Sequence, residues 1–199
     1  MYRVIGSDIN KSTVDLVNSG NEPFPEEENL QQFLNEVIRN KRLSATTDNM
    51  DAVSKSDIVV VVVPLFVDAN ANPDFKAMDA VTRDIGKALR KGMLISYETT
   101  LPIGTTRERF LPVLEELSGL KAGIDFNLVF SPERVLTGRV FSDLRKYPKI
   151  VGGVTESCTQ AGVVFYSKAI EFDIRNDLPK PNGVWAMDSS ESSEFVKLA

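Results

Sequence analysis

The sequence predicts an α/β fold in which a doubly wound parallel sheet is covered by helices on both faces. Short apolar runs typical of strands alternate with amphipathic stretches typical of helices, which is the pattern of parallel α/β domains. Residues 58–63, Ile-Val-Val-Val-Val-Val, are β-branched without alternation, which is typical of a central strand buried on both faces. The composition, 42% apolar and 26% charged, is that of a globular domain.

The first half of the chain contains three expected strands, each followed by helical stretches. We expect strands at residues 2–8, 43–46 and 57–63, and helices at residues 11–19, 26–39, 49–55 and 74–91. Asn10 or Ser12 can begin the first helix, and Gly20 ends it. Residues 67–73 are expected to form a loop.

The second half repeats this alternation. We expect strands at residues 93–97, 126–130, 149–151 and 171–174, and helices at residues 105–117, 155–169 and 189–199. Because proline cannot donate the helical hydrogen bond, Pro112 predicts either a kink in its helix or a helix that starts later than residue 105. Gly152 and Gly153 close the strand that begins at Lys149.

Composition excludes several classes of function. The formal charge of −5, with no concentrated basic patch, argues against nucleic-acid binding. The chain has no histidine and only one cysteine, so histidine-based catalysis, internal disulfides and cysteine-based metal clusters are excluded. No apolar run approaches the ~20 residues needed to span a bilayer. We therefore expect a cytoplasmic protein without a metal or a membrane partner.

Residues 130–138, Phe-Ser-Pro-Glu-Arg-Val-Leu-Thr-Gly, contain the most informative turn. It follows an expected strand and places Glu133 and Arg134 at its carboxyl end, where open α/β sheets bind ligands. A glutamate fixed there is a candidate general base, because the strand holds its backbone and burial raises a carboxyl pKa. The alternative is an ordinary solvated turn.

A glycine-rich phosphate-binding turn is missing from the sequence. Dinucleotide-binding folds open with a strand, a G-x-G-x-x-G turn and a helix, followed by a strand that ends in an acidic residue. Here the strand ending at Asp8 is present, but no G-x-G-x-x-G occurs. The absent strand would lie between the strands that end at Asp8 and Val63, and its absence leaves their edges unpaired. We expect an incomplete Rossmann-like sheet and an internal fragment of a longer protein.

Six stretches in register resemble the N-terminal half of the UDP-glucose/UDP-N-acetylmannosamine dehydrogenase family. They are Val-Ile-Gly-Ser-Asp-Ile-Asn at 4–10, Val-Asn-Ser-Gly at 17–20, Leu-Ser-Ala-Thr-Thr-Asp at 43–48, Thr-Thr-Leu-Pro-Ile-Gly-Thr at 99–105, Ser-Pro-Glu-Arg-Val-Leu at 131–136 and Pro-Lys-Ile-Val-Gly-Gly-Val at 148–154. The resemblance covers nearly all 199 residues. The Pro-Glu-Arg-Val form is more similar to the branch that acts on UDP-N-acetylhexosamines.

The resemblance implies oxidation of the C6 alcohol of a UDP-sugar to a carboxylate, with two NAD⁺ and a covalent thioester on a cysteine. Asp8 matches the acid that grips the adenosine ribose, which favours NAD over NADP because a carboxylate repels a 2′-phosphate. The alternative is that Asp8 caps the next helix. Residues Val63, Pro64 and Leu65 match the Thr-Pro-Thr that lines the cofactor groove, with two hydroxyl residues replaced by apolar ones.

The resemblance also assigns residues to the reaction and the substrate. Thr100 matches a threonine near nicotinamide and the catalytic water, or else bonds its own backbone. Glu133 matches the glutamate that activates the water for thioester hydrolysis. The family's second glutamate is Thr137 here, as fits the N-acetylhexosamine branch.

Arg134, Leu136 and Gly138 would line the path of the sugar nucleotide, and Arg134 is alternatively a surface or subunit-contact charge. Cys158 is a poor candidate for the nucleophile, because the family's cysteine lies in a Gly-Gly-x-Cys motif of the other half. The resemblance places that cysteine and an oxyanion-stabilising lysine outside these 199 residues.

The sequence therefore predicts that residues 1–199 are a partial NAD-binding N-terminal domain. We expect the central dimerisation helix and the C-terminal UDP-sugar domain to lie outside these residues. We expect the fragment alone to be inactive and the full-length protein to form a homodimer that serves polysaccharide synthesis. Two alternatives remain: a single-step NAD-dependent β-hydroxy acid dehydrogenase, and a non-catalytic interaction or regulatory remnant of the fold.

Overall fold

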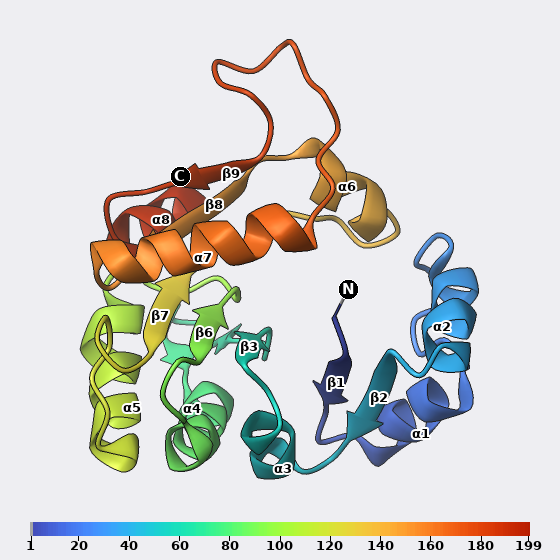
Figure 1. Cartoon of the computed structure of the whole chain (residues 1–199), viewed down its shortest axis with the longest axis horizontal. Helices are drawn as coiled ribbons and strands as arrows, with labels where there is room; N and C mark the ends of the chain where they lie inside the picture. Colours follow the sequence, from blue (N-terminus) through green and yellow to red (C-terminus); the bar gives the residue numbers. More distant parts are fainter. Residues whose placement is uncertain (1) are drawn as a thin grey trace.

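A computed structural model describes residues 2–199 as an α/β fold (Figure 1). Strands in the order β3-β6-β7-β8-β9 form one sheet, β1 pairs with β2, and β4 pairs with β5. The strands are β1 Val4–Ser7, β2 Leu43–Thr46, β3 Ile58–Val61, β4 Phe66–Val67, β5 Pro73–Asp74, β6 Leu94–Tyr97, β7 Asn127–Phe130, β8 Lys149–Gly153 and β9 Val184–Ala186. The helices are α1 Lys11–Ser19, α2 Leu30–Arg39, α3 Asn49–Ser54, α4 Lys76–Ala88, a π-helical segment η1 Thr106–Phe110, α5 Leu111–Ser118, α6 Val140–Lys146, α7 Glu156–Ala169 and α8 Ser190–Leu198.

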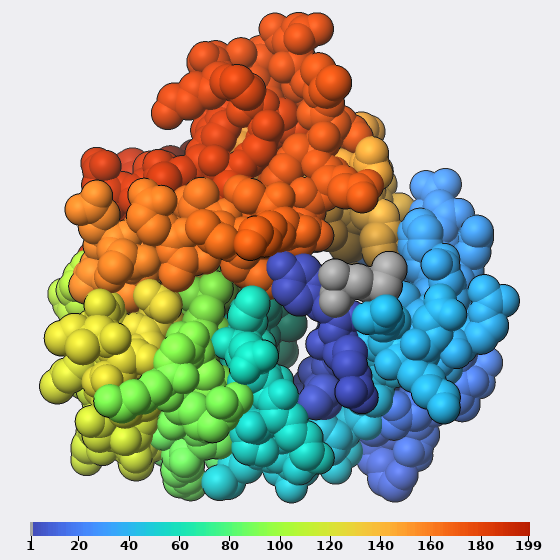
Figure 2. All heavy atoms as spheres, viewed as in Figure 1, coloured from blue at the N-terminus to red at the C-terminus, as the bar shows by residue number. Residues whose placement is uncertain are grey.

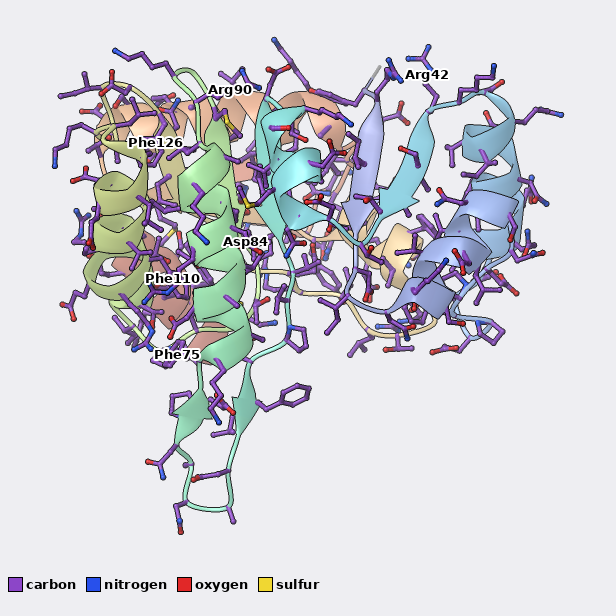
Figure 3. All side chains as sticks on the ribbon, turned by 90° about the horizontal axis from the view of Figure 1, so that it is seen from below. Arg42, Phe75, Asp84, Arg90, Phe110 and Phe126 are labelled. Atoms are coloured by element: carbon purple, nitrogen blue, oxygen red, sulfur yellow. The ribbon has the colours of Figure 1, made fainter. Side chains whose placement is uncertain are left out.

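Helices cover both faces of the larger sheet, as the sequence predicts. Helix α7 lies across one face, and α3, α4 and α5 line the other (Figures 1 and 3). The largest fully buried side chains come from β6, β7 and the helices packed on them; they include Met78, Ile85, Ile95, Tyr97, Phe110, Leu114, Leu128 and Phe130. Phe110 stacks on Tyr97 with ring centroids 4.5 Å apart and meets Phe75 edge-on (Figure 3). This core fixes the carboxyl ends of β6 and β7.

The larger sheet is mostly parallel, as the sequence predicts, and one pair of strands departs from this arrangement. β3, β6 and β7 are parallel, but β8 is antiparallel to β7, and β9 is parallel to β8. A parallel partner for β7 would need a crossover helix over a sheet face. Helix α6, which the sequence analysis did not predict, instead packs against α2, where the Phe33 and Phe141 rings lie 4.7 Å apart. β8 therefore enters the sheet from the opposite end.

The last strand is also displaced from its predicted position. Residues 171–174 form no strand, and the Ile174 side chain is 94% exposed. The strand is β9, in which Val184, Trp185 and Ala186 pair with residues 149–151 of β8. A short apolar alternation did not distinguish a strand from a loop here, because pairing depends on a partner distant in sequence.

Other boundaries differ for local reasons. α2 begins at Leu30 rather than at residue 26, because the backbone of Asn29 is left-handed, with a φ of 63°, and a right-handed helix cannot run through it. α4 ends at Ala88 because Leu89 is extended, so Gly92 lies in the turn before β6. The expected loop at 67–73 contains the hairpin β4–β5, which projects away from the helices (Figure 3). The helix with Pro112 begins as η1, which agrees with the predicted irregularity.

The edges of β1 and β3 that the sequence predicts to be unpaired face each other without a strand between them. Among residues 2–199, β1 pairs only with β2, and β3 pairs only with β6. Figure 2 shows a hollow between the dark blue N-terminal residues and the cyan residues that follow α3. The prediction that the β3 run is buried on both faces is wrong, since Val60 is 41% exposed. This exposure follows from the open edge.

Helix α8 is held against the sheet and η1 by close contacts. A Cβ atom on Gly152 of β8 would lie 2.0 Å from the Ser189 carbonyl oxygen, so only glycine allows this approach. The buried Glu194 carboxylate accepts hydrogen bonds from the amides of Gly104 and Thr106, at 2.6 and 2.9 Å, and from the Thr106 hydroxyl at 2.7 Å. These amides are the free donors at the beginning of η1, where a negative charge is favourable.

A second carboxylate of α8 predicts a pH dependence of stability. Burial raises the pKa of Glu191, but hydrogen bonds outweigh this effect, led by that from the Arg107 guanidinium, and hold the pKa at about 2. Because the folded-state pKa lies below the ordinary value of 4.5, the pair stabilises the fold above pH 4.5 and loses this contribution as the pH falls toward 2. The side chains of Arg107 and Glu191 are 40% and 30% exposed. We therefore expect their ion pair to contribute about 1 kcal/mol or less to the free energy of unfolding.

Urea unfolding of the wild type and Glu191→Gln from pH 7 to pH 2.5 would measure this contribution. The difference in unfolding free energy should be constant at neutral pH and disappear in acid. A difference that does not change with pH would contradict the assignment.

Candidate functional site

The carboxyl ends of β6 and β7 lie side by side and place Glu98 and Glu133 together. Tyr97 and Phe130 are register partners, and the Ser131 amide donates to the Tyr97 carbonyl at 2.9 Å. The Glu133 amide then donates to the Glu98 carbonyl at 3.2 Å. The turn after β7 is thus tied to the end of β6, which holds the backbone of Glu133 where the sequence analysis expects a ligand-binding edge.

The Glu133 carboxylate is both anchored and accessible. Its Oε1 accepts from the Arg134 amide at 2.7 Å, and its Oε2 lies 3.1 Å from Lys149 Nζ. The side chain remains 30% exposed. A carboxylate fixed in this way can take a proton from a molecule that approaches from solvent.

A buried polar network lies behind Glu133. Lys149 Nζ is 3.1 Å from Glu98 Oε2, and their side chains are only 5% and 8% exposed. The Tyr166 hydroxyl donates to Glu98 Oε1 and lies 2.7 Å from the Ser96 hydroxyl. Burial raises the pKa of Glu98, and the Lys149 ammonium offsets part of this shift. Burial likewise raises the pKa of Tyr166 well above its usual value.

A lysine of α8 also reaches this site. Lys197 Nζ donates to the Glu133 carbonyl oxygen at 2.5 Å. Burial lowers the pKa of Lys197, and the nearby Glu133 charge offsets part of that shift. The sequence analysis did not single out this residue, although Ser190, Glu194 and Lys197 share one face of the expected helix. The available signal was only this helical spacing of polar residues, because their burial is visible in the structure alone.

The predicted substrate residues lie in the loop that follows Glu133. The Arg134 guanidinium donates to the Pro148 carbonyl oxygen, and burial lowers the pKa of Arg134. Leu136 is 62% exposed, and its amide donates to Asp143. The Gly138 amide donates to Glu27, and its φ of +83° favours glycine. Arg134 therefore ties the loop to the residue before β8.

The predicted cofactor residues lie on two separate sheets. Asp8 follows β1 and is exposed; its Oδ1 accepts from the Asn10 amide at 2.8 Å. Asn10, not Asp8, caps α1. Since no hydrogen bond from residues 2–199 reaches Asp8 Oδ2, that oxygen can accept one from a ligand. In the described chain, no hydrogen bond links Asp8 to Glu133, Glu98 or Lys149.

The second cofactor group follows β3 and β6. Val63 and Leu65 are half-buried against the core, and Pro64 is exposed. The Thr99 hydroxyl donates to the Val63 carbonyl at 2.7 Å, which joins the two strand ends. The neighbouring Thr100 is exposed and thus accessible. Cys158, in contrast, is fully buried, and its Sγ accepts from the Leu128 amide.

Within residues 2–199 no group of His, Cys, Asp and Glu side chains is arranged to hold a metal ion. No helix in that range combines the length and apolar character needed to cross a bilayer.

The chain contains only some of the residues that an NAD site requires. Asp8 has a free carboxylate oxygen suited to ribose hydroxyls, and residues 63–65 supply a partly apolar surface. The chain contains no G-x-G-x-x-G sequence for the diphosphate. The described chain thus offers an acceptor oxygen and a partly apolar surface for such a cofactor, but no glycine-rich turn for its diphosphate.

Comparison with known proteins gives consistent matches. Residues 1–170 match the NAD binding domain of the UDP-glucose/GDP-mannose dehydrogenase family. The chain is 32% identical to a UDP-N-acetyl-D-mannosamine dehydrogenase of Pyrococcus horikoshii over 199 residues, covering 99% of the chain and 44% of that protein. It is 32% identical to a GDP-mannose 6-dehydrogenase of Pseudomonas putida over 162 residues, covering 79% of the chain and 36% of that protein.

Solved structures match in fold as well. The P. horikoshii enzyme superimposes with a TM-score of 0.87 at 28% identity, covering 99% of this chain and 44% of the other. A ternary complex of a Pseudomonas aeruginosa GDP-mannose dehydrogenase superimposes with a TM-score of 0.86 at 26% identity. The match covers 99% of this chain and 43% of the other. The chain spans less than half the length of these relatives. The matched domain is the one that binds NAD, and the chain belongs to the UDP-glucose/GDP-mannose dehydrogenase family.

Proposed function

We propose that this chain is the NAD-binding portion of a dehydrogenase that oxidises C6 of a UDP-N-acetylhexosamine to the uronate. UDP-N-acetylmannosamine and UDP-N-acetylglucosamine are the candidate substrates, and the product would serve polysaccharide synthesis in the cytoplasm. The observation that carries the proposal is the anchored, solvent-accessible carboxylate of Glu133 at the carboxyl end of β7. Two relatives of similar sequence are named as dehydrogenases of UDP-N-acetyl-D-mannosamine.

Glu133 would activate the water that releases the sugar acid from its thioester. Its hydrogen bond to the Arg134 amide and its contact with Lys149 fix the carboxylate, and its exposed part leaves room for water. Lys197 would assist this step, in place of the oxyanion-stabilising lysine that the sequence analysis expected outside these residues. Its amine lies beside the Glu133 main chain, from which a small movement would direct it at the oxyanion that forms during acyl transfer.

The other predicted residues would bind the ligands. Asp8 would accept hydrogen bonds from the adenosine ribose, while residues 63–65 and Thr100 would border the nicotinamide, which accepts the hydride. Arg134, Leu136 and Gly138 would shape the path of the sugar nucleotide through their loop. Further sugar-binding residues and the nucleophilic cysteine would come from another part of the full-length protein, which we propose forms a homodimer.

A chimera tests this proposal. The stretch of the P. horikoshii enzyme that aligns with this chain would be replaced by the chain itself. UDP-N-acetylmannosamine, UDP-N-acetylglucosamine, UDP-glucose, GDP-mannose and simple β-hydroxy acids would be offered with NAD⁺. The isolated chain serves as the control without the other half.

We expect two NADH per molecule of UDP-N-acetylhexosamine, because conversion of an alcohol to a carboxylate removes two hydrides. The isolated chain should form none. One NADH per turnover from a β-hydroxy acid would favour the single-step alternative. A folded chimera that forms no NADH from any of these substrates would favour a non-catalytic remnant.

A further inference from the structure

The buried ammonium of Lys149 lies between two carboxylates that belong to different strands. Lys149 begins β8, Glu98 follows β6, and Glu133 follows β7. Nζ is 3.1 Å from Glu98 Oε2 and 3.1 Å from Glu133 Oε2, and it lies 3.5 Å from the Pro132 carbonyl oxygen. The three acceptors match the three protons of an ammonium group.

The two carboxylates differ in how firmly they are held. Glu98 is 8% exposed, and its second oxygen accepts from the Tyr166 hydroxyl, which also lies against the Ser96 hydroxyl. Lys149 is itself 5% exposed and lies over the Tyr166 ring, with Nζ 5.0 Å from the ring centroid. Glu133 is 30% exposed and faces solvent. Glu98, Tyr166 and Lys149 thus form a buried group, and Glu133 is the partner of Lys149 that remains accessible to solvent.

Glu98 supplies the counter-charge that the buried ammonium of Lys149 requires. A buried ammonium without a counter-charge is costly, and a buried carboxylate is costly for the same reason. The Glu98–Lys149 pair is neutral, so Lys149 can offer a hydrogen bond to Glu133 without depending on Glu133 for its own charge balance. Two other cations lie near Glu133: Arg134, the next residue in the loop, and Lys197, which comes from α8.

We propose that Lys149 is a positioning residue whose ammonium, fixed by Glu98 and Tyr166, holds the Glu133 carboxylate in the orientation needed to activate water. This inference rests on the proposed role of Glu133 and adds to it the residues that act through it. A fixed carboxylate loses little freedom when the reaction begins, and a displacement of about 1 Å can cost about 10²-fold in rate.

The Arg134 amide provides a direct readout in the 199-residue chain. It donates to Glu133 Oε1 at 2.7 Å, so its NMR chemical shift and hydrogen exchange report whether the carboxylate stays in place. Three variants would be compared with the wild type: Lys149→Met, Lys149→Arg and the double variant Glu98→Gln/Lys149→Met. Lys121→Met is the matched control, because Lys121 pairs with Glu115 on the surface, 64% exposed.

In Lys149→Met we expect the Arg134 amide signal to move upfield and its exchange to accelerate at least about tenfold, because the carboxylate loses a charge-assisted hydrogen bond. Lys149→Arg should restore most of both values, whereas Lys121→Met should change neither. If Lys149→Met fails to fold, the double variant removes both buried charges and should fold, with the same change at Arg134.

An Arg134 amide unchanged in a folded Lys149→Met or double variant would overturn the proposal. An upfield shift and faster exchange of the Arg134 amide in Lys121→Met would also overturn it. This readout needs no substrate, so the positioning role can fail while the chimera forms NADH. Equally, an inactive chimera with the expected change at Arg134 would reject the proposed reaction and leave the Lys149–Glu133 contact established.

Discussion

Replacement of Glu133 by glutamine in the chimera is expected to slow release of the sugar acid by about 10²–10⁴-fold, the range typical of a lost general base. Glutamine keeps the size of the side chain and can still accept from the Arg134 amide, but it cannot take a proton from water. Both hydride transfers precede hydrolysis in the proposed reaction. The variant should therefore form two NADH per site in a burst and then stop, with the sugar bound covalently to the other half of the chimera.

Rapid-mixing measurement of NADH and mass spectrometry of the stalled enzyme test this expectation. Glu116→Gln is the control, since Glu116 is an exposed residue of α5 that forms no hydrogen bond or ion pair with the site residues within 2–199. Steady turnover by Glu133→Gln at the rate of the control would remove Glu133 from the proposed chemistry. Loss of the burst itself would assign Glu133 to an earlier step.

Replacement of Glu194 by leucine is expected to destabilise the chain by about 3–5 kcal/mol. The change removes a carboxylate that accepts three hydrogen bonds from Gly104 and Thr106, and it leaves two buried amides without an acceptor. Burial raises the pKa of Glu194, and the hydrogen bonds from Thr106 and Gly104 offset part of this shift. Glu194→Gln keeps an acceptor oxygen and should lose less than Glu194→Leu.

Urea unfolding at pH 7 measures these losses of stability. Glu191→Gln, on the same helix, is the control, and its free energy of unfolding should lie within about 1 kcal/mol of the wild-type value. Hydrogen exchange at Gly104 and Thr106 locates the effect, because these amides should exchange faster in Glu194→Leu. Equal unfolding free energies for Glu194→Leu and Glu191→Gln would mean that the buried carboxylate does not hold α8 in place.

The sequence predicted the part of the site that depends on local signals. The apolar run before Ser131 and the Ser-Pro turn after it were enough to place Glu133 at the end of a strand, and the structure agrees. The same reasoning located Asp8 after β1 and the glycines that close β8. Each of these positions depends on residues that are neighbours in the chain.

The rest of the site depends on contacts between distant segments. Glu98 and Lys149 are separated by the whole of η1, α5, β7 and α6, and Lys197 arrives from α8. Their burial could not be read from spacing within one element, because each becomes buried only when the strands pair and α7 and α8 pack on them. The antiparallel entry of β8 brings Lys149 to this end of the sheet, which the expected parallel strand would not have done.

The gap between β1 and β3 has a consequence for cooperativity. The segment from β1 to β2 joins the remaining chain through side-chain contacts such as the 2.6 Å hydrogen bond from Ser7 to Asn49, and no backbone ladder crosses from β1 to β3 within residues 2–199. Two sheets without a shared ladder are expected to melt as separate units. A strand that paired with both edges would couple them into a single two-state transition, so this gap decides whether the protein unfolds in one step or in two.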